Sequence, residues 1–162
     1  MFPSFLKKIS AQDDNYTNTI SGNIMINRPA ERLYELWRKP ETLPILMGHF
    51  ASIEILNDTD SNWRINTPIG ALIEWQARII DEKSGEYIHW RSLKGARVPN
   101  EGRLSFQQPT PQMSTVVTLT IRYNPPGGLI GRKIGQMFDL FSRDMLTKTL
   151  HRFKKLAEDE LA

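Results

Sequence analysis

The spacing of the apolar residues changes once along the chain, near Pro125–Gly128. From Ile20 to Tyr123 apolar and polar residues alternate in short runs separated by turn-forming residues, which is typical of β-strands. From about Leu129 to the end, apolar residues recur three and four apart, which predicts one amphipathic helix of about eight turns. A long antiparallel sheet followed by one long helix can bury both apolar faces if the sheet curls around the helix.

The alternating part predicts seven strands, and the last six are joined by links short enough for an antiparallel meander. Between the first two strands, Pro29 and Pro40 each precede an apolar stretch of helical spacing, which predicts two short helices. The fold class expected is therefore α+β. The predicted strands are Thr19–Asn27, His49–Asn57, Trp63–Thr67, Ala71–Asp81, Tyr87–Leu93, Arg103–Gln108 and Ser114–Tyr123.

The length of 162 residues predicts one domain, spanning residues 18–162, after a flexible tail at residues 1–17. The tail has a few apolar residues beside Lys7 and Lys8, so weak contact with a membrane surface is the alternative to a free tail. The chain has no cysteine and no apolar run of the roughly 18 residues that a membrane span needs. These features favour a cytoplasmic protein.

The net charge is +3, and the basic clusters in the C-terminal helical segment have acidic neighbours. Such clusters are typical of a solvated helix face, so no nucleic-acid partner is expected. His49, His89 and His151 lie far apart and form no metal-binding spacing, so neither a metal nor another cofactor is expected. His49, at the start of its strand, is the histidine best placed to reach a cavity.

Three tryptophans fall on the predicted helix-facing side of successive strands, namely Trp63, Trp75 and Trp90. Flat indole rings suit a wall on which a planar ligand stacks, but they also fill a core against Phe138 and Phe141. Ser92 and Tyr123 are the polar groups on that side. The candidate ligand-binding residues are Trp63, Ile65, Ile73, Trp75, Trp90, Ser92, Phe106, Leu119, Tyr123, Met137, Phe138, Phe141 and Met145.

Glu74 and Arg91 are the charged pair that first suggests catalysis. Alternation places both on the outer surface of the sheet, where we expect them to form an ion pair between neighbouring strands. The inward positions supply mainly apolar side chains. No catalytic residue is therefore assigned.

Several strings resemble one superfamily in order and spacing. They are "NRPAERLYELWRKPETLPILM", "WRINTPIGALIEWQARI", "IHWRSLKGARVPNEGRLSF", "IRYNPPGG" and "LHRFKKLAE". Over about Ile20–Leu161 the chain resembles the START-like polyketide cyclase/dehydrase and lipid-transport superfamily (SRPBCC), nearest its coenzyme-Q-binding branch. The resemblance implies the helix-grip (START/Bet v 1-like) fold, with a cavity between the sheet and the C-terminal helix.

The resemblance also implies a hydrophobic small molecule as partner, such as a quinone, a lipid or a polyketide-like aromatic. We expect the cavity mouth at the Lys94–Glu101 loop and the Pro44–Phe50 region. Two alternatives stay open, because the matching strings are structural. One is a polyketide cyclase or aromatase, and the other is a protein-interaction module whose cavity is filled. The sequence does not indicate the oligomeric state.

Overall fold

A computed structural model describes residues 16–66, 70, 72–109, 114–124 and 141–160. The elements in these ranges are β1 (Asn18–Ile26), α2 (Ala30–Arg38), α3 (Thr42–Met47), β2 (Ser52–Ile55), β3 (Asp60–Asn66), β4 (Leu72–Lys83), β5 (Tyr87–Ser92), β6 (Asn100–Gln107), β7 (Thr115–Tyr123) and α5 (Arg143–Glu160).

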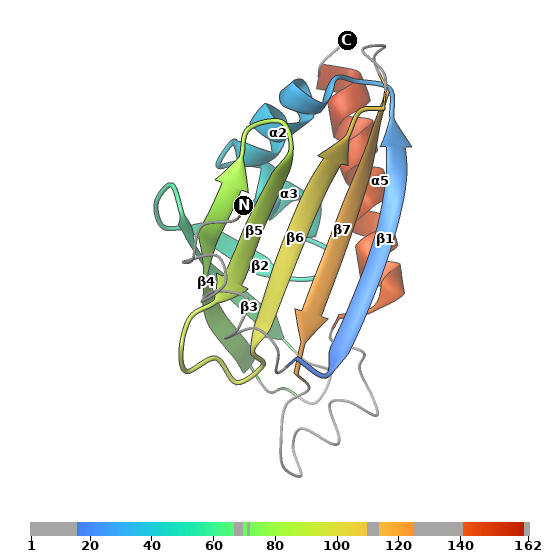
Figure 1. The fold of residues 1–162 in the computed structure, drawn as a ribbon. Helices are drawn as coiled ribbons and strands as arrows, with labels where there is room; N and C mark the ends of the chain where they lie inside the picture. The colour runs from blue at the N-terminus through green and yellow to red at the C-terminus, as the bar shows by residue number, and fades with distance from the viewer. Residues whose placement is uncertain (1–15, 67–69, 71, 110–113, 125–140, 161–162) are drawn as a thin grey trace, which may run out of the picture.

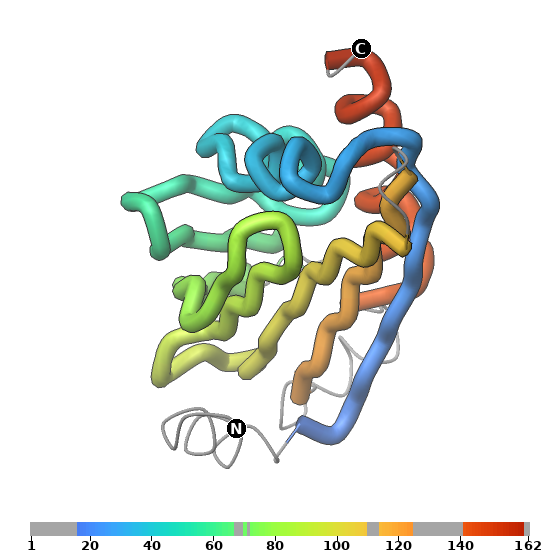
Figure 2. The backbone as a smooth tube through the Cα atoms, turned by 45° about the horizontal axis from the view of Figure 1, so that its top comes forward, coloured from blue at the N-terminus to red at the C-terminus, as the bar shows by residue number. Residues whose placement is uncertain are grey.

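The strands form one seven-stranded antiparallel sheet in the order β1-β7-β6-β5-β4-β3-β2. The helices α2, α3 and α5 lie against one face of this sheet (Figure 1). Figure 2 shows the sheet curling, with the β2–β3 hairpin on one side of the helices and β1 on the other. The predicted α+β class, the meander and the two short helices after the first strand are confirmed.

The apolar side chains on the concave face of the sheet and on the helices form one continuous core. The helix α5 packs mainly on β1, where Gly22 leaves room for the side chain of Leu146. Two turns further along the same face of α5, Phe153 is fully buried and meets the ring of Trp37 edge-on at 5.1 Å. The end of α2 is therefore held against α5, and α3 packs on β2.

The prediction of one helix from about Leu129 to the end is wrong at Phe141 and Ser142, and its residues 129–140 lie outside the described residues. The backbone at Phe141 and Ser142 is not helical, and α5 begins at Arg143. The hydroxyl of Ser142 accepts the backbone N–H of Met145 at 3.1 Å, as an N-cap residue does. A capping serine thus marks the start of α5, which the apolar spacing alone did not reveal. The helix has 18 residues, or about five turns.

The predicted ion pair between Glu74 and Arg91 is wrong, although the outward position of Glu74 is confirmed. The strand β4 extends beyond β5, so that Arg91 lies opposite Arg78. Glu74 lies opposite Arg64 of β3 instead, with 3.3 Å between the Arg64 Nε and the Glu74 carboxylate. Glu74 therefore lies in the part of β4 that extends past β5, and its ion-pair partner comes from β3. The hairpin turn between β4 and β5 alone could not predict that partner.

The predicted tail at residues 1–17 lies outside the described residues, apart from Tyr16 and Thr17. The ring of Tyr16 lies under the Arg122 guanidinium of β7 at 5.5 Å, and the Thr17 N–H donates to Asn124 at 2.8 Å. In the described part of the chain, no helix is long and apolar enough to cross a membrane.

Candidate functional site

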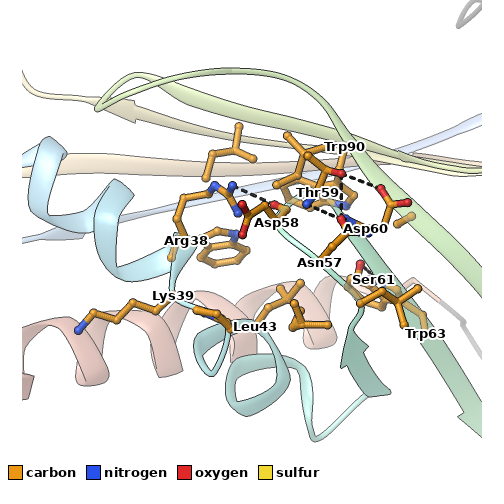
Figure 3. A pocket seen from close by; sticks show the side chains of 17 residues that line it. Arg38, Lys39, Leu43, Asn57, Asp58, Thr59, Asp60, Ser61, Trp63 and Trp90 are labelled. Atoms are coloured by element: carbon orange, nitrogen blue, oxygen red, sulfur yellow. Dashed lines mark hydrogen bonds between the residues drawn. The ribbon is translucent and has the colours of Figure 1, made fainter.

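A cavity of about 450 Å³ lies between the end of α2, the turn joining β2 to β3, and the concave sides of β3, β4 and β5 (Figure 3). Its volume falls in the usual range for small-molecule sites, about 300–1,000 Å³. The lining residues are Trp37, Arg38, Lys39, Pro40, Leu43, Ile55, Leu56, Asn57, Asp58, Thr59, Asp60, Ser61, Trp63, Ala77, Ile79, Ile88 and Trp90.

The inner wall of this cavity is apolar and rich in indole rings. Trp37 of α2 stacks on Trp90 of β5, with 6.3 Å between ring centroids and 25° between the ring planes. Trp63 of β3 also borders the cavity, and its other partner is Trp75, stacked at 5.6 Å and 17°. Trp90 lies directly over Gly102, where a Cβ atom would overlap the indole. The glycine therefore permits the position of Trp90.

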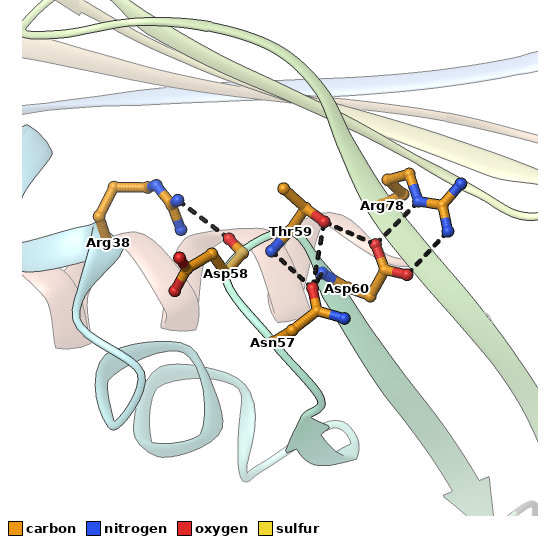
Figure 4. A network of polar contacts seen from close by, with 6 residues as sticks. All are labelled: Arg38, Asn57, Asp58, Thr59, Asp60 and Arg78. Carbon is orange, nitrogen blue, oxygen red and sulfur yellow. Dashed lines mark hydrogen bonds and ion pairs between the residues drawn. The ribbon is translucent and has the colours of Figure 1, made fainter.

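The rim of the cavity is polar and tightly hydrogen-bonded (Figure 4). In the turn before β3, the Asn57 side-chain oxygen accepts the backbone N–H groups of Thr59 and Asp60, each at 2.9 Å. Arg78 donates twice to the Asp60 carboxylate, at 2.8 and 2.9 Å. These bonds, with help from Thr59, lower the pKa of Asp60 to about 2.

On the opposite side of the rim, Arg38 fixes the end of α2. Its Nε donates to the Glu82 carboxylate at 2.9 Å, and its Nη2 donates to the backbone oxygen of Asp58 at 3.0 Å. Tyr34 also donates to Glu82, at 2.5 Å, and burial together with that carboxylate raises the pKa of Tyr34. The guanidinium of Arg38 thus already has a carboxylate partner.

Of the residues predicted to line the cavity, Trp63 and Trp90 do so. Most others lie on the same concave face but pack against one another. Phe141 is the centre of this packed part, with ring contacts to Phe50, Trp75 and Tyr123 at 5.5, 5.9 and 5.0 Å. The packed residues are Ile65, Ile73, Trp75, Phe106, Leu119, Tyr123, Phe141 and Met145. Met137 and Phe138 lie outside the described residues.

A separate crevice of about 10 Å³ lies between the two parts, and it is bordered by Trp63 and Trp90 together with Leu119 and Phe141. Its volume is about that needed for one water molecule. The open space thus lies mainly on one side of Trp63.

Ser92 lies away from the main cavity. Its hydroxyl accepts the backbone N–H of Asn100 at 3.0 Å, and it borders a separate hollow of about 320 Å³ beside the loop that follows β5. His49 lies between α3 and α5, with its Nε2 3.3 Å from the Met145 carbonyl, and burial lowers its pKa. His49 does not line the cavity, and within the described ranges no cluster of potential metal ligands occurs.

The main cavity also opens at a different place from the predicted mouth. Its exposed rim residues are Lys39, Pro40 and the turn Leu56–Thr59. None of the residues in the Lys94–Glu101 loop or the Pro44–Phe50 region lines it. The β2–β3 hairpin and α2 stand apart at this side of the sheet, so the space lies between them.

Fifteen of the 17 lining residues were absent from the predicted set, and the most important of them are Trp37 and Ser61. Trp37 lies in the short helix predicted after Pro29, and its apolar spacing alone did not mark it as a cavity residue. Ser61 lies outside the predicted strand Trp63–Thr67, although it precedes Trp63 by two residues in β3 and so shares its side of the strand. Extending the alternation of β3 backward would have found it.

A model of the polyketide cyclase/dehydrase and lipid transport family matches residues 26–150. The chain belongs to this family. The match spans both short helices, all of β2 to β7 and the first half of α5, so it includes every residue of the cavity wall. A search of curated proteins gave no significant match.

Solved structures support the fold. A protein from Deinococcus radiodurans is 32% identical, with a TM-score of 0.67 over 90% of this chain and 98% of its own. The Zhui aromatase/cyclase from Streptomyces sp. R1128 is 15% identical, with a TM-score of 0.72 over 90% and 96%. A START superfamily protein from Mycobacterium smegmatis is 16% identical, with a TM-score of 0.58 over 86% and 99%. The fold is therefore the helix-grip fold of the START/Bet v 1 type, as the sequence predicted.

Proposed function

We propose that this family member binds or carries an apolar small molecule with a flat ring system, such as a quinone or a polyketide-like aromatic. The observation that carries the proposal is the cavity of about 450 Å³, which Trp37, Trp63 and Trp90 border. Indole rings present large flat surfaces on which another ring system can stack. Lipid chains of similar volume are the other ligand class that such a wall accepts.

The energetics favour an uncharged ligand. Each Å² of apolar ligand surface removed from water contributes about 25 cal/mol, less the cost of immobilising the ligand. A phosphate or other anion on the indole wall would lose its hydration without a partner. At the rim, Arg38 already pairs with Glu82, and Asp60 pairs with Arg78.

Tryptophan fluorescence tests the proposal, because three of the four tryptophans border the cavity. The protein is titrated with a short-chain quinone, a fatty acid and a nucleotide. We expect the quinone to quench the emission with micromolar affinity, and the nucleotide to bind far more weakly. Tighter binding of the nucleotide than of both apolar ligands would contradict the proposal.

Two tryptophan variants locate the binding. Trp90→Ala removes an indole from the cavity wall and should weaken quinone binding by about 1–3 kcal/mol, the scale of aromatic stacking. Trp75→Phe changes an indole in the packed part and should leave the affinity nearly unchanged. Equal effects of the two variants would place the ligand elsewhere.

The two alternatives make different demands on this cavity. A cyclase needs an acid or a base beside the bound chain, and Asp60, a carboxylate at the cavity, is held by Arg78 with a pKa of about 2. A protein-interaction module needs no internal space. The open cavity and the engaged carboxylate of Asp60 therefore support binding of a small molecule over both alternatives.

A further inference from the structure

Ser61 places a hydroxyl group in the apolar wall of the cavity. It lies on the concave side of β3, between Ile55 of β2 and Ala77 of β4, and only 8% of the residue is exposed. Trp63 follows two residues later on the same side, and Figure 3 shows the two side chains next to each other.

The hydrogen bond between these two residues leaves the hydroxyl proton of Ser61 available. The Trp63 indole N–H donates to the Ser61 oxygen at 2.9 Å, so it uses a lone pair of that oxygen. A serine hydroxyl has one proton to donate and two lone pairs. Among the residues that the structure describes, none accepts that proton. A buried donor without an acceptor is unfavourable, so a ligand or a water molecule in the cavity must supply one.

The polar side chains that directly precede Ser61 in the chain are already occupied. The hydroxyl of Thr59 lies 3.1 Å from the Asn57 side-chain oxygen and 2.9 Å from the Asp60 carboxylate. Asp60 itself accepts from Arg78. Ser61 differs from these groups because it is buried within the wall and its proton has no described acceptor.

We propose that Ser61 donates a hydrogen bond to a neutral oxygen of the bound molecule, so that the ligand is an apolar ring compound with a carbonyl or ether oxygen. The inference rests on the proposed function and narrows its ligand class. The indole N–H of Trp63 orients the hydroxyl and strengthens its donor character, since hydrogen bonds in a chain polarise one another. A carboxylate is disfavoured at this position, because a single neutral donor does not compensate a buried charge.

Fluorene and fluorenone test the inference, because these flat tricyclic molecules differ only in a CH₂ group and a C=O group. Their dissociation constants are measured by tryptophan quenching with the wild-type chain and with Ser61→Ala. We expect Ser61→Ala to reduce fluorenone binding about five- to ten-fold, as for the loss of one hydrogen bond, while fluorene binding stays within about two-fold.

The ratio of the two affinities is the deciding quantity, because a small shift of Trp63 in the variant affects both ligands alike. Ser92→Ala is the control, since Ser92 borders the other hollow and not the main cavity, and the affinity ratio of this variant should match that of the wild type. If the ratio of fluorenone to fluorene affinity in Ser61→Ala equals that of the wild type, Ser61 does not donate to the ligand oxygen, while the proposed function still stands. Failure of the wild-type chain to bind either ligand overturns both.

Discussion

The concave face of the sheet has two ends that share the same chemistry but differ in packing. At one end Trp75, Tyr123 and Phe141 fill the space between sheet and helices, and the Phe141 ring centroid lies 5.9 Å from that of Trp75 and 5.0 Å from that of Tyr123. At the other end Trp37, Trp63 and Trp90 surround a cavity of about 450 Å³. Trp63 belongs to both ends, because it stacks on Trp75 and also borders the cavity.

The difference shows that aromatic content does not distinguish a binding wall from a core. The two ends differ in the elements that cover the concave face of the sheet. At the packed end Phe141 closes over the sheet, whereas at the open end α2 and the β2–β3 turn meet through Arg38 and Asp58 only at the rim. A polar contact at the rim fixes the separation of the two elements without filling the space below it.

The largest effect is expected at the packed end. Phe141→Ala removes a ring that is 3% exposed and contacts three other rings, so it should destabilise the fold by about 3–5 kcal/mol. Leu56→Ala, at the cavity rim and 44% exposed, should cost much less. Urea unfolding of both variants measures the contrast. Similar losses would mean that the open end is as tightly packed in solution as the other.

Gly102→Ala tests how the open end keeps its shape. A Cβ atom at this position overlaps the indole of Trp90, so the ring must move, at a cost of about 1–3 kcal/mol. Gly22→Ala is the matched control, because there the new atom meets the end of the Leu146 side chain. We expect Gly102→Ala alone to shift tryptophan emission and weaken quinone binding. An unchanged emission spectrum in Gly102→Ala would show that Trp90 is not confined.

The stacked residues Trp63 and Trp75 differ in the hydrogen bonding of their indole N–H groups, and a smaller effect on stability is expected from this difference. The Trp63 N–H donates to Ser61, whereas the Trp75 N–H has no hydrogen-bond partner in the described part of the chain. Replacement by phenylalanine removes similar volume at both sites. Trp63→Phe should therefore be less stable than Trp75→Phe by about 1 kcal/mol, the value of one hydrogen bond. The reverse order in thermal unfolding would indicate that Trp75 has an unseen partner.

Much of the fold followed from local patterns in the sequence. Alternation placed Trp63 and Trp75 on the concave side, where they are 3% and 4% exposed. The prolines before the two short helices also marked their positions correctly. These features depend on residues close together in the chain, which a periodicity records directly.

The location of the open space could not be predicted in the same way. It depends on how far the curl of the sheet carries the β2–β3 hairpin from α2, and residues distant in sequence decide this. Two local signals were also misinterpreted. The polar run Asn57–Asn62 looked like a turn, so the start of β3, which contains Ser61, was not predicted. The helix cap at Ser142 lies within a continuous helical spacing of apolar residues, so the start of α5 was not predicted either.

The smallest expected effect concerns Asp60, which precedes Ser61 and joins the open end to β4 through Arg78. Hydrogen bonds from Arg78, then from Thr59, lower the pKa of Asp60 from an ordinary 3.8 to about 2 in the folded protein. Because the folded-state pKa is depressed, the contribution of Asp60 to stability is present above about pH 3.8. It is lost as the pH falls toward 2. The wild-type chain should therefore lose more stability over this interval than Asp60→Asn or Arg78→Gln, as measured by the denaturant midpoint. Equal slopes for all three chains would contradict the pairing and leave the rim of the cavity without this anchor.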